Sequence, residues 1–150
     1  MKRQLVSFND SILKQKCEET PYLNTEIGQD LEDTFINGKL NGVGLAAPQI
    51  GLPYRSCVCL IDGVAEIMNN PVIEKIGEET FVNKERCLSF PNIVCTVKRA
   101  SKIKVVYFDK KWHKCERILE GVQAEIVQHE CDHLDGITML SIALKKEFKK

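Results

Sequence analysis

Apolar residues recur at intervals of four in an early part of the chain, which is the spacing of one helical face. These positions are Ile27, Leu31 and Phe35. A capping residue, Asn24 or Thr25, precedes them, and the pair Asn41-Gly42 follows Leu40. Because capping residues begin helices and glycine often ends them, the pattern predicts a helix from Asn24 or Thr25 to about Leu40.

The middle of the chain carries short runs rich in valine and isoleucine, the composition of β-strands. The runs cover Ser56 to Ile61, Val72 to Ile76, Ile93 to Val97, Ile103 to Phe108 and a segment from about Lys114 to Leu119. Between the last two, Asp109-Lys110-Lys111 is a short polar break that predicts a hairpin. We therefore expect antiparallel sheets.

The segment VQAEIVQHECDHL, which follows Glu120-Gly121, returns to helical spacing. Its positions on one face are Val122, Ile126, His129 and His133. The pattern predicts a second helix whose face packs on the core, so the two histidines lie on a helix that also builds the interior.

The length and charge of the chain limit the classes of protein that fit it. A chain of 150 residues is long enough for one domain with its own hydrophobic core. It has no repeat, low-complexity tract or linker, so a single domain over residues 1–150 is expected. Lysine plus arginine, 21 residues, equals aspartate plus glutamate, 21, which argues against DNA or an anionic membrane as the main partner. No segment approaches the roughly 18 apolar residues of a membrane span, and we expect a soluble, untargeted protein.

The seven cysteines do not indicate a disulfide framework. Their number is odd and the chain is larger than a typical disulfide-stapled domain, so reduced thiols in a cytosol-like compartment are expected. Cys57 and Cys59 alternate with Val58 and Leu60, which predicts ordinary packing in a buried strand. No tandem C-x-x-C pairs occur, so a zinc ribbon has no support.

The segment from His129 to His133, HECDH, has the H-E-x-x-H pattern of metal-dependent hydrolases. Residues four apart on a helix stand about 6 Å apart on the same side, so both imidazoles can reach one ion. Glu130, beside the first histidine, is placed to deprotonate a water molecule. The alternative is a solvated glutamate and two histidines with structural roles.

A hydrolytic metal site also needs a third protein ligand and an open position for water. Only 17 residues follow His133, and their one glutamate, Glu147, lies in a lysine-rich tail, so the third ligand is expected upstream. Cys87, in KERCLSFP, lies outside any alternating core pattern, and a thiolate beside two imidazoles suits zinc or iron(II). The alternative for Cys87 is a small buried apolar residue.

The stretch GVGLAAPQIG, from Gly42 to Gly51, is rich in small residues. Glycines and alanines let another backbone or a peptide ligand approach closely, and Gln49 adds a neutral amide donor. The alternative is a tight turn that enters a strand.

Together these stretches resemble the motifs of the peptide deformylases, the enzymes that remove the formyl group from the N-terminal methionine of new chains. The first motif matches Gly42 to Gln49 at every defining position. The second, normally Glu-Gly-Cys-Leu-Ser, matches Glu85, Cys87, Leu88 and Ser89, and the third matches His129, Glu130 and His133. The resemblance runs from about residue 25 to 140, with the motifs in the family's order.

The resemblance implies a metal-dependent hydrolase that releases formate from formyl-methionine. Its native metal would be Fe²⁺, with Zn²⁺, Ni²⁺ or Co²⁺ as substitutes, and the implied ligands are Cys87, His129 and His133. Glu130 would be the general acid and base, while the side-chain amide of Gln49 and the backbone N–H of Leu88 would hold the oxyanion. The implied substrate-binding residues are Val43, Gly44, Glu85, Val122, Glu125 and Ile126.

The resemblance also implies an α+β fold, in which antiparallel β-sheets pack around a central C-terminal helix carrying the H-E-x-x-H motif, with an N-terminal helix. Formyl-methionyl nascent peptides are the implied partners, and a contact with the ribosome near its exit tunnel is a second implied interaction. Both partners imply a location in the cytoplasm or in an organelle. The tail IALKKEFKK is expected to be a solubilising end or a short basic contact. The alternative functions are a small metalloprotease and a silent relative that only binds nascent N-termini.

Two positions depart from the family pattern. Arg86 occupies the usual glycine of the second motif, and Glu125, four residues before His129, occupies a position that is usually apolar in the family. A carboxylate that is buried and unpaired is costly, so we expect Glu125 to point into water or to pair with Arg86 at the pocket mouth.

Overall fold

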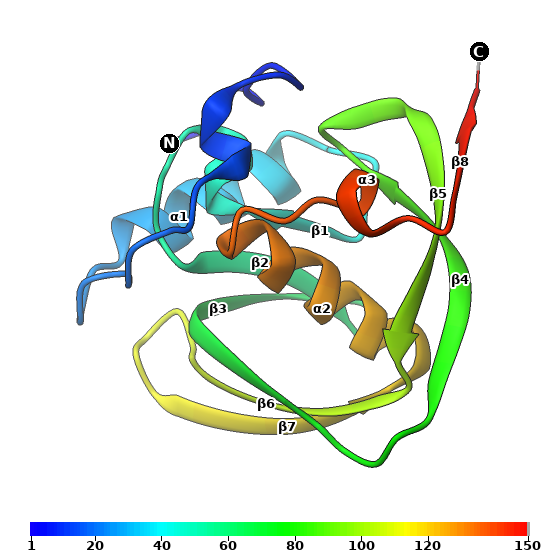
Figure 1. The fold of residues 1–150 in the computed structure, drawn as a ribbon. Coiled ribbons are helices and arrows are strands. Elements are labelled where there is room, and N and C mark those ends of the chain that lie inside the picture. Colours follow the sequence, from blue (N-terminus) through cyan, green and yellow to red (C-terminus); the bar gives the residue numbers. More distant parts are fainter. Residues whose placement is uncertain (150) are drawn as a thin grey trace.

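The computed structural model describes residues 1–149 and arranges them as two antiparallel sheets around one long helix (Figure 1). The strands are β1 (Gly44–Ala46), β2 (Ser56–Ile61), β3 (Val64–Lys75), β4 (Thr80–Cys87), β5 (Phe90–Ala100), β6 (Lys102–Phe108), β7 (Lys114–Glu120) and β8 (Lys145–Phe148). The five-stranded sheet has the order β1-β2-β3-β6-β7 and the three-stranded sheet the order β4-β5-β8. The α+β architecture implied by the resemblance is confirmed.

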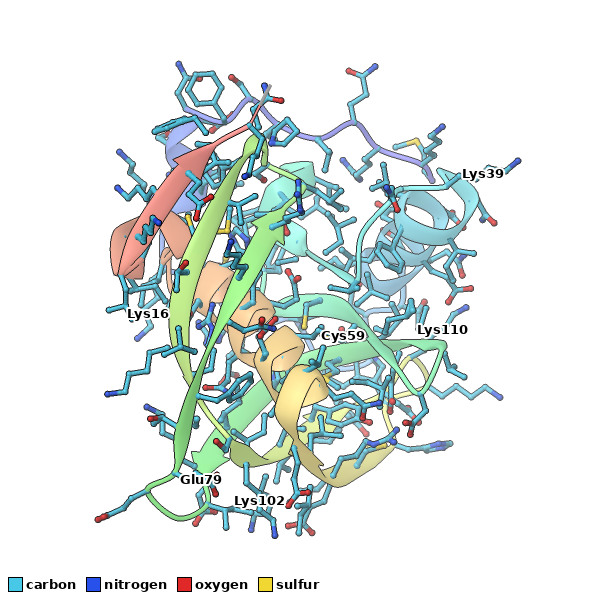
Figure 2. The ribbon with its side chains drawn as sticks, turned by 90° about the vertical axis from the view of Figure 1, so that its right-hand side faces the viewer. Lys16, Lys39, Cys59, Glu79, Lys102 and Lys110 are labelled. Carbon is cyan, nitrogen blue, oxygen red and sulfur yellow. The ribbon has the colours of Figure 1, made fainter. Side chains whose placement is uncertain are left out.

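The long central helix, α2, packs between the two sheets. The helices are α1 (Glu26–Glu32), α2 (Gly121–Leu134) and α3 (Met139–Ile142), with shorter helical turns at Ser11–Lys14, Asp33–Asn37 and Ala47–Ile50. Figure 2 views the molecule from the side of β4 and β5, and α2 lies between these strands and the five-stranded sheet. Val127 and Leu134 of α2 are fully buried, and burying such a side chain contributes about 1.5–3 kcal/mol.

The N-terminal helix begins where the pattern predicted and ends earlier. Asn24 caps it, because its Oδ1 accepts a hydrogen bond from the N–H of Ile27 at 3.1 Å. The range Asp33–Asn37 continues α1 as a π-helical turn, and Gly38 follows it. The predicted end near Leu40 was therefore wrong, since the helical segment stops where glycine, a poor helix former, occurs.

The predicted strand runs fall on observed strands, and β2 has its predicted range. β3 begins at Val64 rather than Val72, because its first half pairs with β2 across a tight turn at Asp62 and Gly63. Both turn residues have positive φ, 51° and 78°, as a two-residue hairpin turn of type I′ requires. The predicted hairpin between β6 and β7 is confirmed.

Strand β4 was not expected from the sequence. Its residues TFVNKERC place polar or charged side chains on both faces, so no apolar alternation marks it. It forms because it pairs along its length with β5, from Thr80 opposite Ala100 to Cys87 opposite Phe90. This pairing matters for function, since β4 carries the second motif.

The predicted packing of the β2 cysteines is confirmed. Cys57 and Cys59 are fully buried in the main hydrophobic core, together with residues of β3, β6 and α2. The two cysteines therefore act as small apolar residues that pack between the five-stranded sheet and α2.

The C-terminal segment forms a strand rather than a free end. β8 pairs with β5, with Phe148 opposite Ile93 and Lys145 opposite Thr96. The sequence did not predict this strand, in which the backbone extends the sheet while the lysine side chains remain exposed. Within residues 1–149, no helix has the length and apolar character needed to cross a membrane.

Candidate metal centre

Three candidate ligand atoms converge where the end of β4 meets α2. The sulfur of Cys87 and ring nitrogens of His129 and His133 all lie within 4.8 Å of one another. Sγ of Cys87 is 3.4 Å from Nε2 of His133, and the two imidazole rings have centroids 5.2 Å apart. All three side chains are buried. The structure thus brings the sequence-predicted ligand set together.

The donor set fits a divalent transition metal. One thiol and two imidazoles are the ligands that zinc and iron(II) accept, and three protein ligands leave a position open. Burial, together with the nearby positive charges of His129 and Arg99, lowers the pKa of His133 to about 3, so the ring is neutral and able to bind a metal. Oε1 of Glu130 is buried without a hydrogen-bond partner among residues 1–149, which leaves it free for a water molecule.

Glu130 has the environment of a general base. Its side chain is only 3% exposed, and burial raises its pKa to about 7, although the charge of His129 acts in the opposite direction. A carboxyl group that titrates near neutral pH can both accept and return a proton. A Cβ atom at Gly44 would come within 2.5 Å of Oε2 of Glu130, so the glycine lets β1 approach this carboxylate.

A buried chain of charges supports His129 from behind. Its Nδ1 lies 2.8 Å from Oε1 of Glu85, and Arg99 donates to both oxygens of Glu85 at 2.8 Å. Arg99 also donates to Asp132 at 2.5 Å. Burial would raise the pKa of Glu85, but the hydrogen bonds from Arg99 and His129 hold it at about 2. With a proton on Nδ1, the ring keeps Nε2 for a metal.

Two residues of this buried network of charges were not expected from the sequence. Arg99 lies in VKRA, where no motif marks it, and Asp132 lies inside HECDH without an assigned role. Glu85 was predicted to bind substrate; it lines the cavity, but both of its oxygens already accept hydrogen bonds from Arg99. Its surroundings favour a role in positioning His129.

The amide of Gln49 is held beside Cys87. Oε1 of Gln49 accepts a hydrogen bond from the N–H of Ala46 at 2.8 Å, which turns the amino group toward the candidate ligands. That amino group donates to Oγ of Ser89 at 2.9 Å and lies 3.5 Å from Sγ of Cys87. Leu88 follows Cys87 directly, in the turn between β4 and β5.

A cavity of about 900 Å³ opens over these residues. All of the residues predicted to bind substrate line it, namely Val43, Gly44, Glu85, Val122, Glu125 and Ile126. β1 and β4, each the outermost strand of its sheet, contribute residues to its walls. The cavity therefore lies between two sheet edges that have no neighbouring strand on that side, within the part of the chain described.

Glu125 lies deeper than expected. It is 8% exposed and accepts a hydrogen bond from Nδ2 of Asn83 at 2.8 Å, and burial raises its pKa. The predictions that it points into water or pairs with Arg86 were wrong. The alternation of β4 turns Asn83 toward α2 and turns Arg86 outward, where it makes no ion pair with any residue in the range 1–149.

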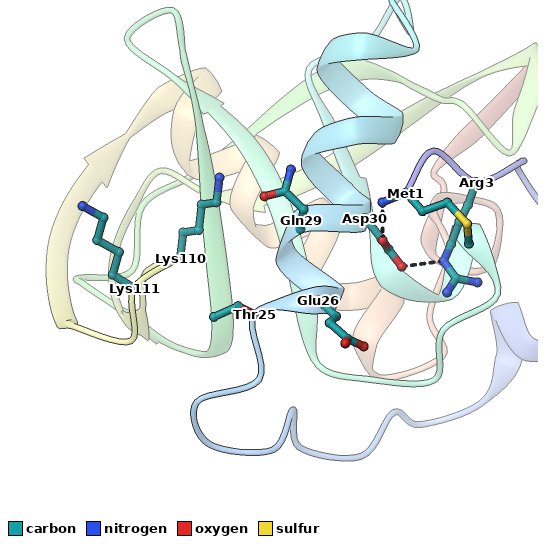
Figure 3. A pocket seen from close by; sticks show the side chains of 8 residues that line it. All are labelled: Met1, Arg3, Thr25, Glu26, Gln29, Asp30, Lys110 and Lys111. Carbon is teal, nitrogen blue, oxygen red and sulfur yellow. Dashed lines mark hydrogen bonds and ion pairs between the residues drawn. The ribbon is translucent and has the colours of Figure 1, made fainter.

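A second cavity, of about 620 Å³, lies away from the motifs, beside α1 (Figure 3). One of its acids, Asp30, is paired with two cations that line the same cavity. Asp30 accepts hydrogen bonds from the N-terminal ammonium of Met1 at 2.6 Å and from Nε of Arg3 at 2.7 Å. None of the eight lining residues belongs to the three motifs, and we assign no chemistry to this cavity.

Comparison with known proteins places this geometry in context. The family model described as polypeptide deformylase matches residues 2–149. The peptide deformylase of Pelotomaculum thermopropionicum is 39% identical over 144 residues, covering 93% of this chain and 90% of the relative. That of Thermotoga petrophila is 35% identical over 136 residues, covering 89% and 82%.

Solved structures agree with the sequence relatives. The crystal structure of peptide deformylase from Thermotoga maritima is similar with a TM-score of 0.88 and 32% identity, covering 97% of this chain and 99% of that chain. A peptide deformylase from Synechococcus elongatus in complex with actinonin gives a TM-score of 0.86 at 27% identity, covering 95% and 79%.

Proposed function

The chain belongs to the polypeptide deformylase family of hydrolases, and we propose that it uses a bound metal to release formate from the formyl-methionine of newly made polypeptides. One observation carries the metal dependence. Cys87, His129 and His133 converge beside Glu130, a buried carboxyl with a pKa of about 7, and Cys87, His129 and Glu130 line the cavity.

Each proposed catalytic group has a defined task. When bound, a divalent metal ion polarises the formyl carbonyl and makes water a stronger acid. Glu130 takes a proton from the attacking water, and the resulting hydroxide adds to the formyl carbon. As the carbon–nitrogen bond breaks, Glu130 returns the proton to the leaving amine.

The oxyanion that forms during attack needs donors. One N–H of the Gln49 amino group donates to Oγ of Ser89, and the other, which is directed at Sγ of Cys87 at 3.5 Å, is the proposed donor to the oxyanion. The backbone N–H of Leu88 is the second proposed donor. A preorganised donor of this kind acts without having to rearrange during the reaction.

The peptide itself would bind as an added strand. β1 pairs with β2 on one side only, and Val43 and Gly44 line the cavity on the other side. An extended peptide laid between β1 and β4 would gain main-chain hydrogen bonds from these free edges. The methionine side chain would then occupy the region of Val122, Glu125 and Ile126, which line the same cavity.

Fe²⁺ is the proposed native metal, with Zn²⁺, Ni²⁺ or Co²⁺ able to occupy the same ligands. Nascent formyl-methionyl chains are the proposed substrates, and a contact with the ribosome and a cytoplasmic location follow from that role as further proposals. A single domain spanning residues 1–150 is part of the same proposal.

The test is a formate-release assay with metal analysis on the same anaerobically prepared sample. We expect formate from formyl-methionyl peptides, in proportion to bound metal, and no cleavage within the peptide. Acetyl-methionyl peptides are the matched control, since they differ only at the acyl group. Internal cleavage would favour a metalloprotease, and a fully metal-loaded protein without formate release would favour a binding protein.

A further inference from the structure

The exposed rim of the cavity is positively charged, whereas the acidic residues of the cavity lie deeper inside it. Of the lining residues in the described range, those both exposed and charged are Lys84, Arg86 and Lys149. Lys84 and Arg86 are two apart on β4, so both point outward, and Lys149 directly follows β8. The chain as a whole has no net charge, so this accumulation of cations is local.

The acidic residues of the cavity cannot neutralise this rim. Glu85 is bound by Arg99, Glu125 accepts from Asn83, and both carboxyl groups are buried. Glu130 is also buried, at 3% exposure. The acids therefore lie inside the cavity, away from the solvent-exposed cations.

One partly exposed carboxylate, that of Glu147, is shared by several of the cations near the rim. Glu147 lies 3.6 Å from Nζ of Lys84, 3.3 Å from Nζ of Lys149 and 3.7 Å from Nζ of Lys145. Arg86 has no ion-pair partner in residues 1–149, and its neighbour in the chain is the candidate ligand Cys87. A positive surplus therefore remains at the point where the cavity opens.

An extended peptide bound between β1 and β4, as proposed above, would pass along this rim as it leaves the cavity. An extended peptide advances about 3.3 Å per residue, so residues two to four after the formyl group would pass beyond the buried ligands. A guanidinium group binds a carboxylate with two parallel hydrogen bonds, and lysines add point charges. The chemistry that complements the rim is therefore an acidic side chain in the early part of the peptide.

We propose that Arg86, together with Lys84 and Lys149, makes this enzyme prefer formyl-methionyl peptides with Asp or Glu at positions two to four. The preference rests on the proposed deformylase function and refines its substrate class. Since the rim is exposed, each ion pair changes kcat/KM by only about threefold. The effect is also sensitive to salt, because exposed charges are screened beyond about 8 Å at physiological ionic strength.

The experiment compares kcat/KM for three amidated peptides, formyl-Met-Glu-Glu-Ala, formyl-Met-Gln-Gln-Ala and formyl-Met-Lys-Lys-Ala. With two charged residues, we expect the acidic peptide to exceed the basic one by about tenfold at low salt. The ratio should fall toward one as KCl rises from about 0.05 M to about 0.5 M. This salt series needs no variant, so it tests the proposal on the unaltered protein.

Variants then assign the preference to Arg86. Arg86→Gln should lower the acidic-to-basic ratio about threefold, Arg86→Lys should retain most of it, and Arg86→Glu should lower it further. Lys114→Gln is the matched control, because Lys114 is exposed on β7 and does not line the cavity, so the ratio should not change.

Two results would overturn the proposal. A ratio near one for the unaltered protein at low salt would remove the preference itself, and equal ratios for the unaltered protein and Arg86→Gln would remove its assignment to Arg86. Failure of the proposed function looks different, since no formate would then appear from the neutral glutamine peptide.

Discussion

Nδ1 of His129 lies 2.8 Å from Oε1 of Glu85, and this contact joins α2 to β4 at the candidate metal centre. Arg99 holds the same carboxylate with two further hydrogen bonds of 2.8 Å. Arg99 thus fixes the position of the Glu85 carboxylate, and this carboxylate fixes the orientation of the His129 imidazole. Loss of Glu85 would leave the ring freer to turn and Arg99 without its main partner.

We expect Glu85→Ala to lower the affinity for metal by about 10- to 100-fold, because the supporting partner of a ligating histidine fixes its orientation. Competition with a chelator of known affinity measures this change, and circular dichroism checks that the variant is folded. Glu147→Ala is the control, since it removes a partly exposed carboxylate outside the metal centre. Unchanged metal affinity in Glu85→Ala would contradict the positioning role.

Two variants should distinguish the role of a metal ligand, Cys87, from the role of the general base, Glu130. Cys87→Ala removes a proposed ligand, so metal content and activity should fall together. Glu130→Ala leaves all three proposed ligands, so metal should stay near full occupancy while kcat falls by roughly 10²-fold or more. Metal analysis and formate release on the same samples measure both quantities. Near-normal turnover by Glu130→Ala would rule out the proposed mechanism.

Sensitivity to oxygen tests the identity of the metal. A ferrous ion beside a thiolate ligand would be open to oxidation, and so would Cys87 itself. Activity should therefore decay in air for the iron form and decay more slowly after reconstitution with nickel or zinc. The half-life in air is the measurement. Equal half-lives for all three metals would exclude iron chemistry as the cause.

The buried pair of Glu125 and Asn83 makes one wall of the cavity polar. Glu125→Ile should raise the preference for formyl-Met over formyl-Gln peptides by ~1 kcal/mol, about fivefold in kcat/KM, because an apolar contact replaces a buried carboxyl. Asn83→Ala tests whether the hydrogen bond holds Glu125 in place, and it should shift the same ratio. An unchanged ratio in Glu125→Ile would remove this residue from selectivity.

The ion pairs of Asp30 predict a dependence of stability on pH. Burial would raise the pKa of Asp30, but hydrogen bonds from the ammonium of Met1 and from Arg3 outweigh it and hold the pKa below its usual value. Such a group stabilises the fold above the ordinary aspartate pKa of about 3.9, and this contribution is lost as the pH falls through the lowered value. Urea unfolding should show the protein more stable than Asp30→Asn at about pH 6, with the difference shrinking below about pH 4. A difference that does not change with pH would contradict the assignment.

The sequence by itself determined those features that depend on near neighbours. His129 and His133 face the same side of α2 because the helical period acts over four residues, and β2 and the β6–β7 hairpin follow from short runs and turn residues. The three motifs also indicated the family, because their residue types and order are sufficient for recognition. The position of Cys87 outside any apolar pattern made it a candidate ligand, and the match to the second motif implied that role.

Only the tertiary structure decided which distant residues meet. Cys87 and His133 are 46 positions apart in the chain, and Glu125 bonds to Asn83 across 42 positions. Both contacts depend on β4, which has polar residues on both faces and therefore no period of its own. The pairing of β4 with β5 and its packing over α2 select which side chains turn inward, and these are long-range interactions that no local pattern encodes.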